Sequence, residues 1–163
     1  LMGSDNDYEI MKETAVALGE LGIPFEMTVS SAHRTPERTA NFVRGAKERG
    51  IKILIAGAGA AAHLAGVVAA ETILPVIAVP IDATPLNGMD ALLAMVQMPA
   101  GIPVATMAIG KAGARNAGIF AAQMLAVDDV VLSEKLVQFK VDMAAGVEAK
   151  AEALSQRLAK DFS

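Results

Sequence analysis

The sequence predicts an α/β fold in which a doubly wound parallel sheet lies between two layers of helices. Short apolar runs that do not alternate with polar residues are each followed by a segment with helical spacing, a pattern typical of strands buried on both faces. Hydrophobic residues make up 53% of the chain but aromatic residues only 4%. Much of the apolar content is alanine, which favours close packing of helices on a sheet and leaves apolar surface for subunit contacts.

The first third of the chain predicts two strands and two helices in alternation. Leu1-Met2 is expected to end the first strand, and the polar turn at residues 3–7 supplies capping side chains for a helix. A Gly-Ile-Pro break precedes the second strand, at residues 25–29. Thr35-Pro36 then predicts a helix with proline in its first turn, and Gly50 is expected to end it.

Three further strands are expected in the rest of the core, and each leads to a helix. The predicted strands cover residues 52–56, 75–79 and 102–109. The helices are expected directly after His63 and at residues 89–96 and 114–125. Strands of this kind, each followed by a helix, predict a three-layer parallel sheet similar to that of flavodoxin.

A long helical stretch from Asp128 to Phe162 follows this core. We expect one domain over residues 1–163, with a core at residues 1–126 and a C-terminal helix at residues 127–163. So long a helix has little left to pack on within its own subunit, which favours an oligomer contact. A solvated terminal helix is the alternative interpretation.

Composition argues against several classes of partner. The net charge is −4 and Lys and Arg form no stripe or tail, so nucleic-acid binding is not expected. Residues 53–70 are uncharged, but they are mostly Ala and Gly and include His63, so we expect no membrane span and no secretion signal. The chain has no cysteine, which fits a reducing, cytoplasmic setting without disulfides or thiolate metal sites.

The polar clusters of the chain fall where predicted strands end. Ligands of doubly wound sheets bind outside the carboxyl ends of the strands. The clusters are residues 4–7, 30–34 and 57–63, together with Asp82 and Lys111.

Two of these clusters are open to a functional interpretation. His33 beside the fixed cation Arg34 favours proton chemistry on an anionic substrate, with an ordinary surface loop as the alternative. Ser4 and Asp7 either cap the first helix or bind an anion and the hydroxyls of a ribose. His63, flanked by Ala and Leu, is expected to be a buried, hydrogen-bonded histidine, and neither histidine has neighbours at metal-ligand spacing.

A glycine-rich stretch allows a different class of function. Gly57, Gly59 and Ala62 match the dinucleotide-binding fingerprint, and Asp82 ends the next predicted strand about 20 residues later. The fingerprint normally follows the first strand of a sheet, whereas here it follows the third. Small residues at these positions also serve tight packing of a helix on a strand, so a nucleotide-cofactor module stays an alternative.

Four segments in order carry a more specific resemblance. They are Gly3-Ser-Asp-Asn-Asp7, Ser31-Ala-His-Arg-Thr-Pro36, Ala56-Gly-Ala-Gly-Ala-Ala-Ala-His-Leu64 and Gln97-Met-Pro-Ala-Gly-Ile-Pro-Val-Ala-Thr106. Together they closely resemble the N5-carboxyaminoimidazole ribonucleotide mutase family of purine biosynthesis. The resemblance runs from Met2 to about Ala126.

The resemblance implies an isomerase that converts N5-carboxyaminoimidazole ribonucleotide to 4-carboxy-5-aminoimidazole ribonucleotide without metal or organic cofactor. It implies that His33 is the general acid and base, which releases CO2 from the carbamate and later removes the ring proton. It further implies a homo-octamer and a small-molecule nucleotide as substrate. The implied substrate-binding residues are Arg34 for the phosphate, Asp7 for the ribose, Ser4 for the carboxylate region, and Ser31, Ala58, Gly59 and His63 in the pocket.

The chain departs from the family pattern at a few positions. Asn6 stands where the family usually has Ser, Tyr8 where Trp is common, and Ala60 and Ala65 replace a frequent Gly and Pro. Asn keeps a hydrogen-bonding side chain, so we expect altered affinity and retained function. A second branch of the family carboxylates aminoimidazole ribonucleotide directly with CO2, and this branch is the alternative to the mutase.

Overall fold

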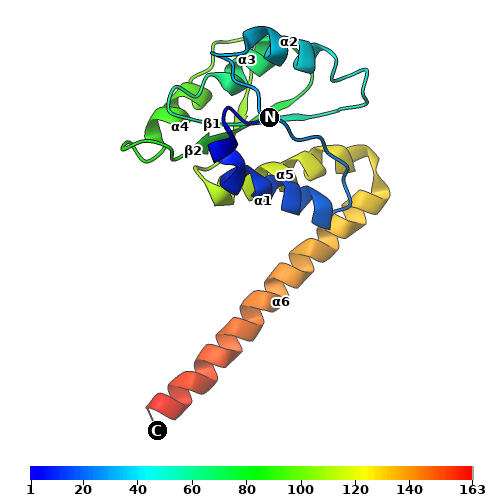
Figure 1. Ribbon diagram of the computed structural model, residues 1–163. Coiled ribbons are helices and arrows are strands. Elements are labelled where there is room, and N and C mark those ends of the chain that lie inside the picture. The colour runs from blue at the N-terminus through cyan, green and yellow to red at the C-terminus, as the bar shows by residue number, and fades with distance from the viewer. Residues whose placement is uncertain (163) are drawn as a thin grey trace. The chain divides into compact units, whose positions relative to one another are not determined.

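The computed structural model describes residues 1–162 and divides the chain into two compact units. The first unit is Leu1–Met124 and the second begins at Leu125. The first unit contains the sheet and the helices around it, and the second contains the C-terminal helix (Figure 1). The expectation of a single domain over the whole chain stays a prediction.

The centre of the first unit is a parallel sheet. Its strands are β1 (Leu54–Gly59), β2 (Val76–Ile81) and β3 (Ala105–Thr106), in the order β1-β2-β3. Met2 extends the sheet beyond β1, because it pairs in parallel with Gly57 on one side and with Val29 on the other. Counted in chain order, the five segments are those around Met2 and Val29 and then β1, β2 and β3. Across the sheet their order is 2-1-3-4-5, which is the order of the flavodoxin-like fold expected from the sequence.

Several strands differ in length from those predicted. The first two are single bridges around Met2 and Val29, held by Met2 N to Thr28 O and Ser30 N to Met2 O bonds of 3.0 and 2.8 Å. The predicted strand at 102–109 is only the two-residue β3, since Pro103 has no N–H to donate to the ladder. β1 and β2 instead run beyond their predicted ends, to the paired residues Gly59 and Ile81.

The helices follow the predicted order closely. Residues 89–96 form a helix with the expected bounds, whereas the helix predicted to end at Gly50 ends at Arg44, where Gly45 caps it and turns follow. The helical elements are η1 (Asp5–Asp7), α1 (Tyr8–Glu20), α2 (Pro36–Arg44), α3 (Leu64–Ala70), α4 (Met89–Val96) and α5 (Lys111–Leu125).

Two separate cores cover the two faces of the sheet. On one face, Val43 of α2, Val68 of α3 and Met95 of α4 pack with Val76 and Ala78 of β2. On the other face, side chains of α1 and α5 pack with alternate β2 residues. Figure 1 shows α1 and α5 lying next to each other on one side of the strands. These alternate residues are Ile77, Val79 and Ile81. The three-layer arrangement predicted from the sequence is confirmed.

Small residues let α1 and α5 approach closely. A Cβ added to Gly118 of α5 would lie 2.9 Å from both Ala17 Cβ and Thr14 O of α1. Both atoms belong to a helix that is buried along this face, so they have little room to move. The alanine-rich composition of α5 thus has a direct packing reason.

The second unit consists of η2 (Ala126–Asp128) and α6 (Val130–Asp161), a helix of 32 residues. The Asp129 side chain caps α6 by accepting a hydrogen bond of 3.0 Å from Leu132 N. Leu132 is the one buried residue of α6 within the described chain. No helix in residues 1–162 is both long enough and apolar enough to cross a membrane.

Candidate active site

The loop that carries His33 joins the Val29 segment to α2 and is closed by its own hydrogen bonds. Thr35 caps α2, and its N–H donates to Ser31 O at 2.9 Å. The Thr35 hydroxyl also donates to Ser31 O and accepts from Ser31 N, at 3.0 and 3.1 Å. The loop is therefore a tight ring in which His33 lies near the middle.

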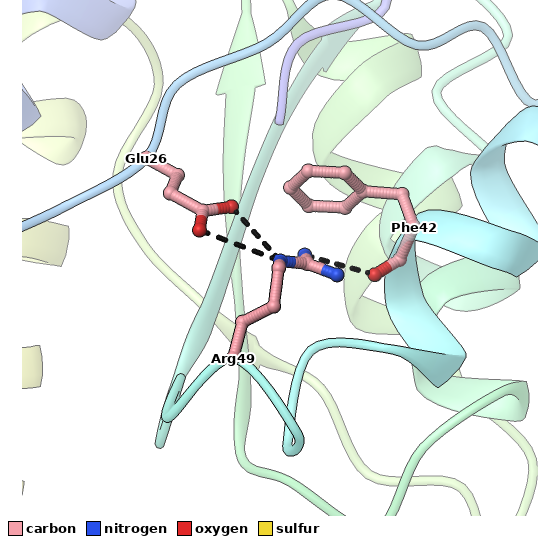
Figure 2. A network of polar contacts seen from close by, with 3 residues as sticks. All are labelled: Glu26, Phe42 and Arg49. Atoms are coloured by element: carbon pink, nitrogen blue, oxygen red, sulfur yellow. Dashed lines mark hydrogen bonds and ion pairs between the residues drawn. The ribbon is translucent and has the colours of Figure 1, made fainter.

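Arg49 fixes the chain on both flanks of this loop. Its Nε donates to Glu26 of the preceding segment at 3.2 Å, and its Nη2 donates to Phe42 O of α2 at 3.1 Å (Figure 2). The guanidinium carbon lies 4.4 Å from the centre of the Phe42 ring, within the range of a cation–π contact. The segment that leads into the His33 loop is thus tied to the turn that follows α2.

His33 and His63 form a pair at the open end of the sheet. His33 Nε2 lies 2.9 Å from His63 Nδ1, and the two rings meet edge to face with their centres 5.0 Å apart. His63 is hydrogen-bonded as the sequence predicts, but the expectation that it is buried is wrong. It directly precedes α3, outside the apolar face of that helix, and both histidines are exposed where a ligand can reach them.

The pairing restricts where protons can lie. A hydrogen bond between two imidazoles needs an N–H on one ring and a lone pair on the other. Two imidazolium rings would present two N–H groups to each other, so the bonded pair holds at most one positive charge. An imidazole that exchanges one proton near neutral pH is suited to general acid and base chemistry.

Ser4 and Asp7 form the capping box considered from the sequence. Ser4 Oγ accepts from Asn6 N at 3.3 Å, and Asp7 Oδ2 accepts from Ser4 N at 2.9 Å. Burial raises the pKa of the Asp7 carboxyl above its ordinary value, against the opposing effect of backbone N–H groups of Ser4 and Gly3. The capping interpretation is confirmed, and the buried carboxylate beside the loop stays available as a hydrogen-bond acceptor.

Arg34 connects the His33 loop to the Ser4 loop. Its Nη2 donates to Gly3 O at 3.4 Å and its Nε donates to Ser31 Oγ at 3.4 Å. Ser31 Oγ also accepts from the Arg34 N–H at 3.2 Å. Arg34 forms no ion pair with any residue of the described chain, so its exposed guanidinium keeps a full positive charge for an anion.

The end of β1 lies beside the Ser4 loop and is the third part of the site, after the His33 loop and the Ser4 loop. Ala58 is buried, and a Cβ added to Gly3 would lie 3.8 Å from Ala58 Cβ, which places the two loops side by side. Gly59 has no room for a side chain, because a Cβ there would lie 2.5 Å from Ala83 Cβ. Ala60 follows with a φ of 53°, a left-handed conformation that is strained for alanine.

The structure brings three of the predicted polar clusters together. They lie at the carboxyl ends of the Val29 segment, the Met2 segment and β1, where the strand order reverses and doubly wound folds bind ligands. No hydrogen bond or ion pair within residues 1–162 joins Asp82 or Lys111 to them. The predicted site residues in the assembled group are Ser4, Asp7, Ser31, His33, Arg34, Ala58, Gly59 and His63.

The structure also shows why glycines stand in the stretch that matches the dinucleotide-binding fingerprint. The fingerprint glycines have packing roles, since a Cβ on Gly57 would lie 2.2 Å from Met11 Sδ of α1. No three acidic or histidine side chains of the described chain gather as metal ligands, and the expected absence of a metal stays a prediction.

Sequence reasoning gave no role to Ser30, although it begins the polar cluster at residues 30–34, and it overlooked Thr39; the buried hydroxyls of the two residues lie 2.8 Å apart below the loop. Their only signal in the sequence is a polar residue at each end of a short loop-to-helix segment.

Comparison with known proteins decides the family. The family model described as AIR carboxylase matches residues 1–146 of the chain. The chain belongs to the AIR carboxylase family. This assignment confirms the resemblance that the four sequence segments carry.

Relatives within the AIR carboxylase family match nearly the whole chain. The chain is 51% identical over 156 residues to an N5-carboxyaminoimidazole ribonucleotide mutase of Pyrococcus horikoshii, covering 96% of this chain and 87% of the relative. A Bacillus subtilis protein with the same name is 57% identical over 136 residues, covering 83% of this chain and 84% of the relative. The crystal structure of Treponema denticola PurE matches the fold with a TM-score of 0.75 at 24% identity, over 99% of this chain and 96% of that one.

Proposed function

We propose that this protein is an N5-carboxyaminoimidazole ribonucleotide mutase, an isomerase of purine biosynthesis. The observation that carries the proposal is the exposed His33–His63 pair, 2.9 Å apart, at the meeting point of three loops. Two relatives that are about half identical over most of the chain bear this name. An exposed imidazole beside an unpaired guanidinium suits proton transfer on an anionic nucleotide.

In the proposed reaction His33 acts twice. As an imidazolium it protonates the carbamate nitrogen, the bond from that nitrogen to the carboxyl carbon breaks, and CO2 is released into the site. The ring carbon of the aminoimidazole then attacks CO2, and His33 removes the proton from that carbon. His33 thus returns to its starting state, with His63 orienting its ring through the hydrogen bond.

The surrounding groups support binding of such a substrate. We assign Arg34 to the phosphate, since its charge is not neutralised within the described chain. We assign Asp7 to the ribose hydroxyls, because a carboxylate that accepts one bond from Ser4 N still has acceptor capacity. Ser4 faces the carboxylate region in this proposal, and Ser31, Ala58, Gly59 and His63 line the pocket.

Retention of CO2 needs a close-fitting wall. Gly59 lies against Ala83 and Ala58 is buried, so the end of β1 offers small side chains and main chain at close range. Such a wall lets backbone groups approach a carboxylate and limits the loss of CO2 between the two steps.

The decisive experiment follows turnover of synthetic N5-carboxyaminoimidazole ribonucleotide in buffer stripped of bicarbonate. We expect rapid formation of the carbon-carboxylated isomer by the wild-type protein. His33→Asn is expected to fold normally, with a circular dichroism spectrum like that of the wild type, and to lose turnover. A His33→Asn variant with near-wild-type turnover would remove His33 from the mechanism.

The alternative function is direct carboxylation of aminoimidazole ribonucleotide. The description of the matching family, AIR carboxylase, names this reaction. A carboxylase would leave the carbamate substrate unchanged in this buffer. It would consume aminoimidazole ribonucleotide only as bicarbonate or CO2 is raised. The same purified protein thus separates the two reactions.

The proposal includes a homo-octamer in the cytoplasm that needs no cofactor. Exposed valines along α6, including Val137, Val141 and Val147, support a role of this helix in assembly. The lack of cysteine supports a reducing compartment. A mass measurement in solution tests the assembly.

A further inference from the structure

Two hydroxyl side chains are buried directly beneath the His33 loop. Ser30 is 1% exposed and Thr39 is 0% exposed, and their hydroxyl oxygens lie 2.8 Å apart. Ser30 is the last residue before the loop, and its N–H donates to the O atom of Met2, whose segment lies between Val29 and β1 in the sheet. Thr39 belongs to the first turns of α2, after the loop.

The direction of the hydrogen bonds follows from the count of protons. The Thr39 hydroxyl has a single hydrogen, and it donates to Thr35 O at 3.2 Å. The hydrogen between the two hydroxyls must therefore come from Ser30. The bonds run from Ser30 Oγ to Thr39 Oγ1 and from Thr39 Oγ1 to Thr35 O, a chain in which each bond polarises the next.

These two hydrogen bonds fix both ends of the His33 loop through the side chain of Thr39. Ser30 precedes the loop and Thr35 ends it. Thr39 is therefore hydrogen-bonded to the residues on both sides of the segment that carries His33. Within residues 1–162, the side chain of His33 is hydrogen-bonded only to His63, at 2.9 Å. The orientation of its ring therefore depends on how firmly the ends of the loop are fixed.

We propose that Thr39 is a positioning residue of the reaction, which holds the His33 loop at the separation that lets His33 meet His63. This inference has a kinetic test, which rests on the proposed function, and a spectroscopic test, which rests on the geometry alone. Thr39 touches no part of the expected substrate site, since it is buried under the loop.

The kinetic test compares Thr39→Val with a matched control elsewhere. Valine keeps the branched shape but removes the hydroxyl, so Ser30 is left with an unpartnered buried donor and Thr35 O loses one bond. The control is Thr14→Val in α1, where Thr14 is 3% exposed and its hydroxyl donates to Ala114 O at 2.6 Å. Both variants lose a buried hydroxyl and its hydrogen bond, and only one lies under the loop.

We expect Thr39→Val to lower kcat about 10-fold or more with KM changed less than threefold, because a small misplacement of a catalytic group is costly. Thr14→Val should stay within about twofold of wild-type kcat, and Thr39→Ser, which restores the hydroxyl, should recover most of the loss. All assays are run well below the melting temperature of each variant. Equal kcat values for Thr39→Val and Thr14→Val would overturn the proposal.

The spectroscopic test does not depend on the reaction. The chain has two histidines, so protein labelled with ¹⁵N-histidine gives two imidazole patterns, both from this pair. We expect each ring to show one fixed tautomer in the wild type and in Thr14→Val, because the hydrogen bond between His33 Nε2 and His63 Nδ1 needs an N–H on one ring and a lone pair on the other, and averaged tautomers in Thr39→Val. Wild-type spectra from Thr39→Val would contradict the inference. If the wild-type protein has no mutase turnover but Thr39→Val still shows this spectral change, the proposed function is refuted and the role of Thr39 in holding the histidine pair stands.

Discussion

Asp7 keeps a carboxyl group where most water is excluded. Its pKa is raised from the ordinary value of 3.8, mainly by burial. Between the ordinary and the raised pKa the folded protein binds more protons than the unfolded chain, so this group lowers the free energy of unfolding as pH rises through that window. Ionisation of the buried Asp7 carboxyl therefore costs stability, which a ligand-binding role would justify.

Asp7→Asn separates these two effects. The amide oxygen can still accept from Ser4 N, so the capping bond is kept. We expect the variant to be at least as stable as the wild type at neutral pH and to lack the part of the pH dependence of unfolding that Asp7 causes. We expect KM for the nucleotide to rise about tenfold, because bonds to a charged acceptor are stronger than those to a neutral one.

Chemical denaturation at a series of pH values and steady-state kinetics check both expectations. Asp5→Asn serves as the control: Asp5 is exposed and lies near Asp7, and the amide oxygen of Asn can still accept the 3.1 Å bond that Ser4 Oγ donates to Asp5 Oδ1. A drop in the stability of Asp7→Asn at neutral pH, with KM unchanged, would show that Asp7 is only a capping residue.

For single residues, the sequence points to the candidate site residues more clearly than to the buried residues beneath the His33 loop. His33 and Arg34 stand out because a histidine beside a fixed cation follows a predicted strand, although an ordinary surface loop fits the same pattern, and the family resemblance favours the functional interpretation. Ser30 and Thr39 are not visible, because serine and threonine suit exposed loop and helix positions equally well. Only the fold shows that both hydroxyls are buried and bonded to each other.

Among the helices, the contact between α1 and α5 is the one most sensitive to side-chain volume. Gly118→Ala would add a methyl group 2.9 Å from Ala17 Cβ and from Thr14 O. We expect a net loss of about 1 kcal/mol in the free energy of unfolding, since overpacking of roughly 1–3 kcal/mol exceeds the gain in helix propensity.

Gly19→Ala is the matched control for this substitution. Gly19 lies in α1 as well, and nothing lies within 4 Å of a Cβ built there. The same change of residue should therefore raise the free energy of unfolding by about 0.5–1 kcal/mol. Urea denaturation of the two variants tests the sign, and a stabilised Gly118→Ala would show that the two helices can separate at little cost.

The elements differ in how well their bounds follow from sequence. α4 has the predicted bounds of residues 89–96, because Gly88 at a positive φ and the Pro99 turn mark its two ends. The short pairings at Met2 and Val29 do not follow from the sequence, since apolar runs do not reveal where a neighbouring strand stops. Strand length is set by the partner as much as by the strand itself.

For the molecule as a whole, the proposed octamer predicts a partner for α6. Val137 and Val141 are 63% and 54% exposed, which is an unusual amount of apolar surface for one helix to leave in water. We expect the double substitution Val137→Glu and Val141→Glu to give smaller assemblies, because buried unpaired carboxylates at an interface are costly.

Light scattering coupled to size-exclusion chromatography measures this change in mass. Lys140→Gln, on the same helix and also exposed, is expected to keep the mass of the wild type. Circular dichroism shows whether the sheet and helices stay folded in each variant. An unchanged mass for the double variant would mean that α6 is a solvated helix, as the alternative interpretation holds.

The architecture at this scale follows largely from the alternation of apolar runs and helical segments. Topology rules fix a parallel sheet and place ligands at the carboxyl ends of its strands. They do not say which loops meet, and the polar residues near predicted strand ends also include Asp82 and Lys111. The bridge from Met2 to both Val29 and Gly57 selects the three loops that do.

That bridge also sets the order in which the sheet can form. The segment around Met2 lies inside the sheet, between Val29 and Gly57, although both partners come later in the chain. On the ribosome it must wait for each of them, and β1 in turn waits for β2. Parallel pairings between distant segments form slowly and leave apolar edges open meanwhile. After β1 has emerged and before β2 has, the edge of β1 that later pairs with β2 is therefore left without a partner strand.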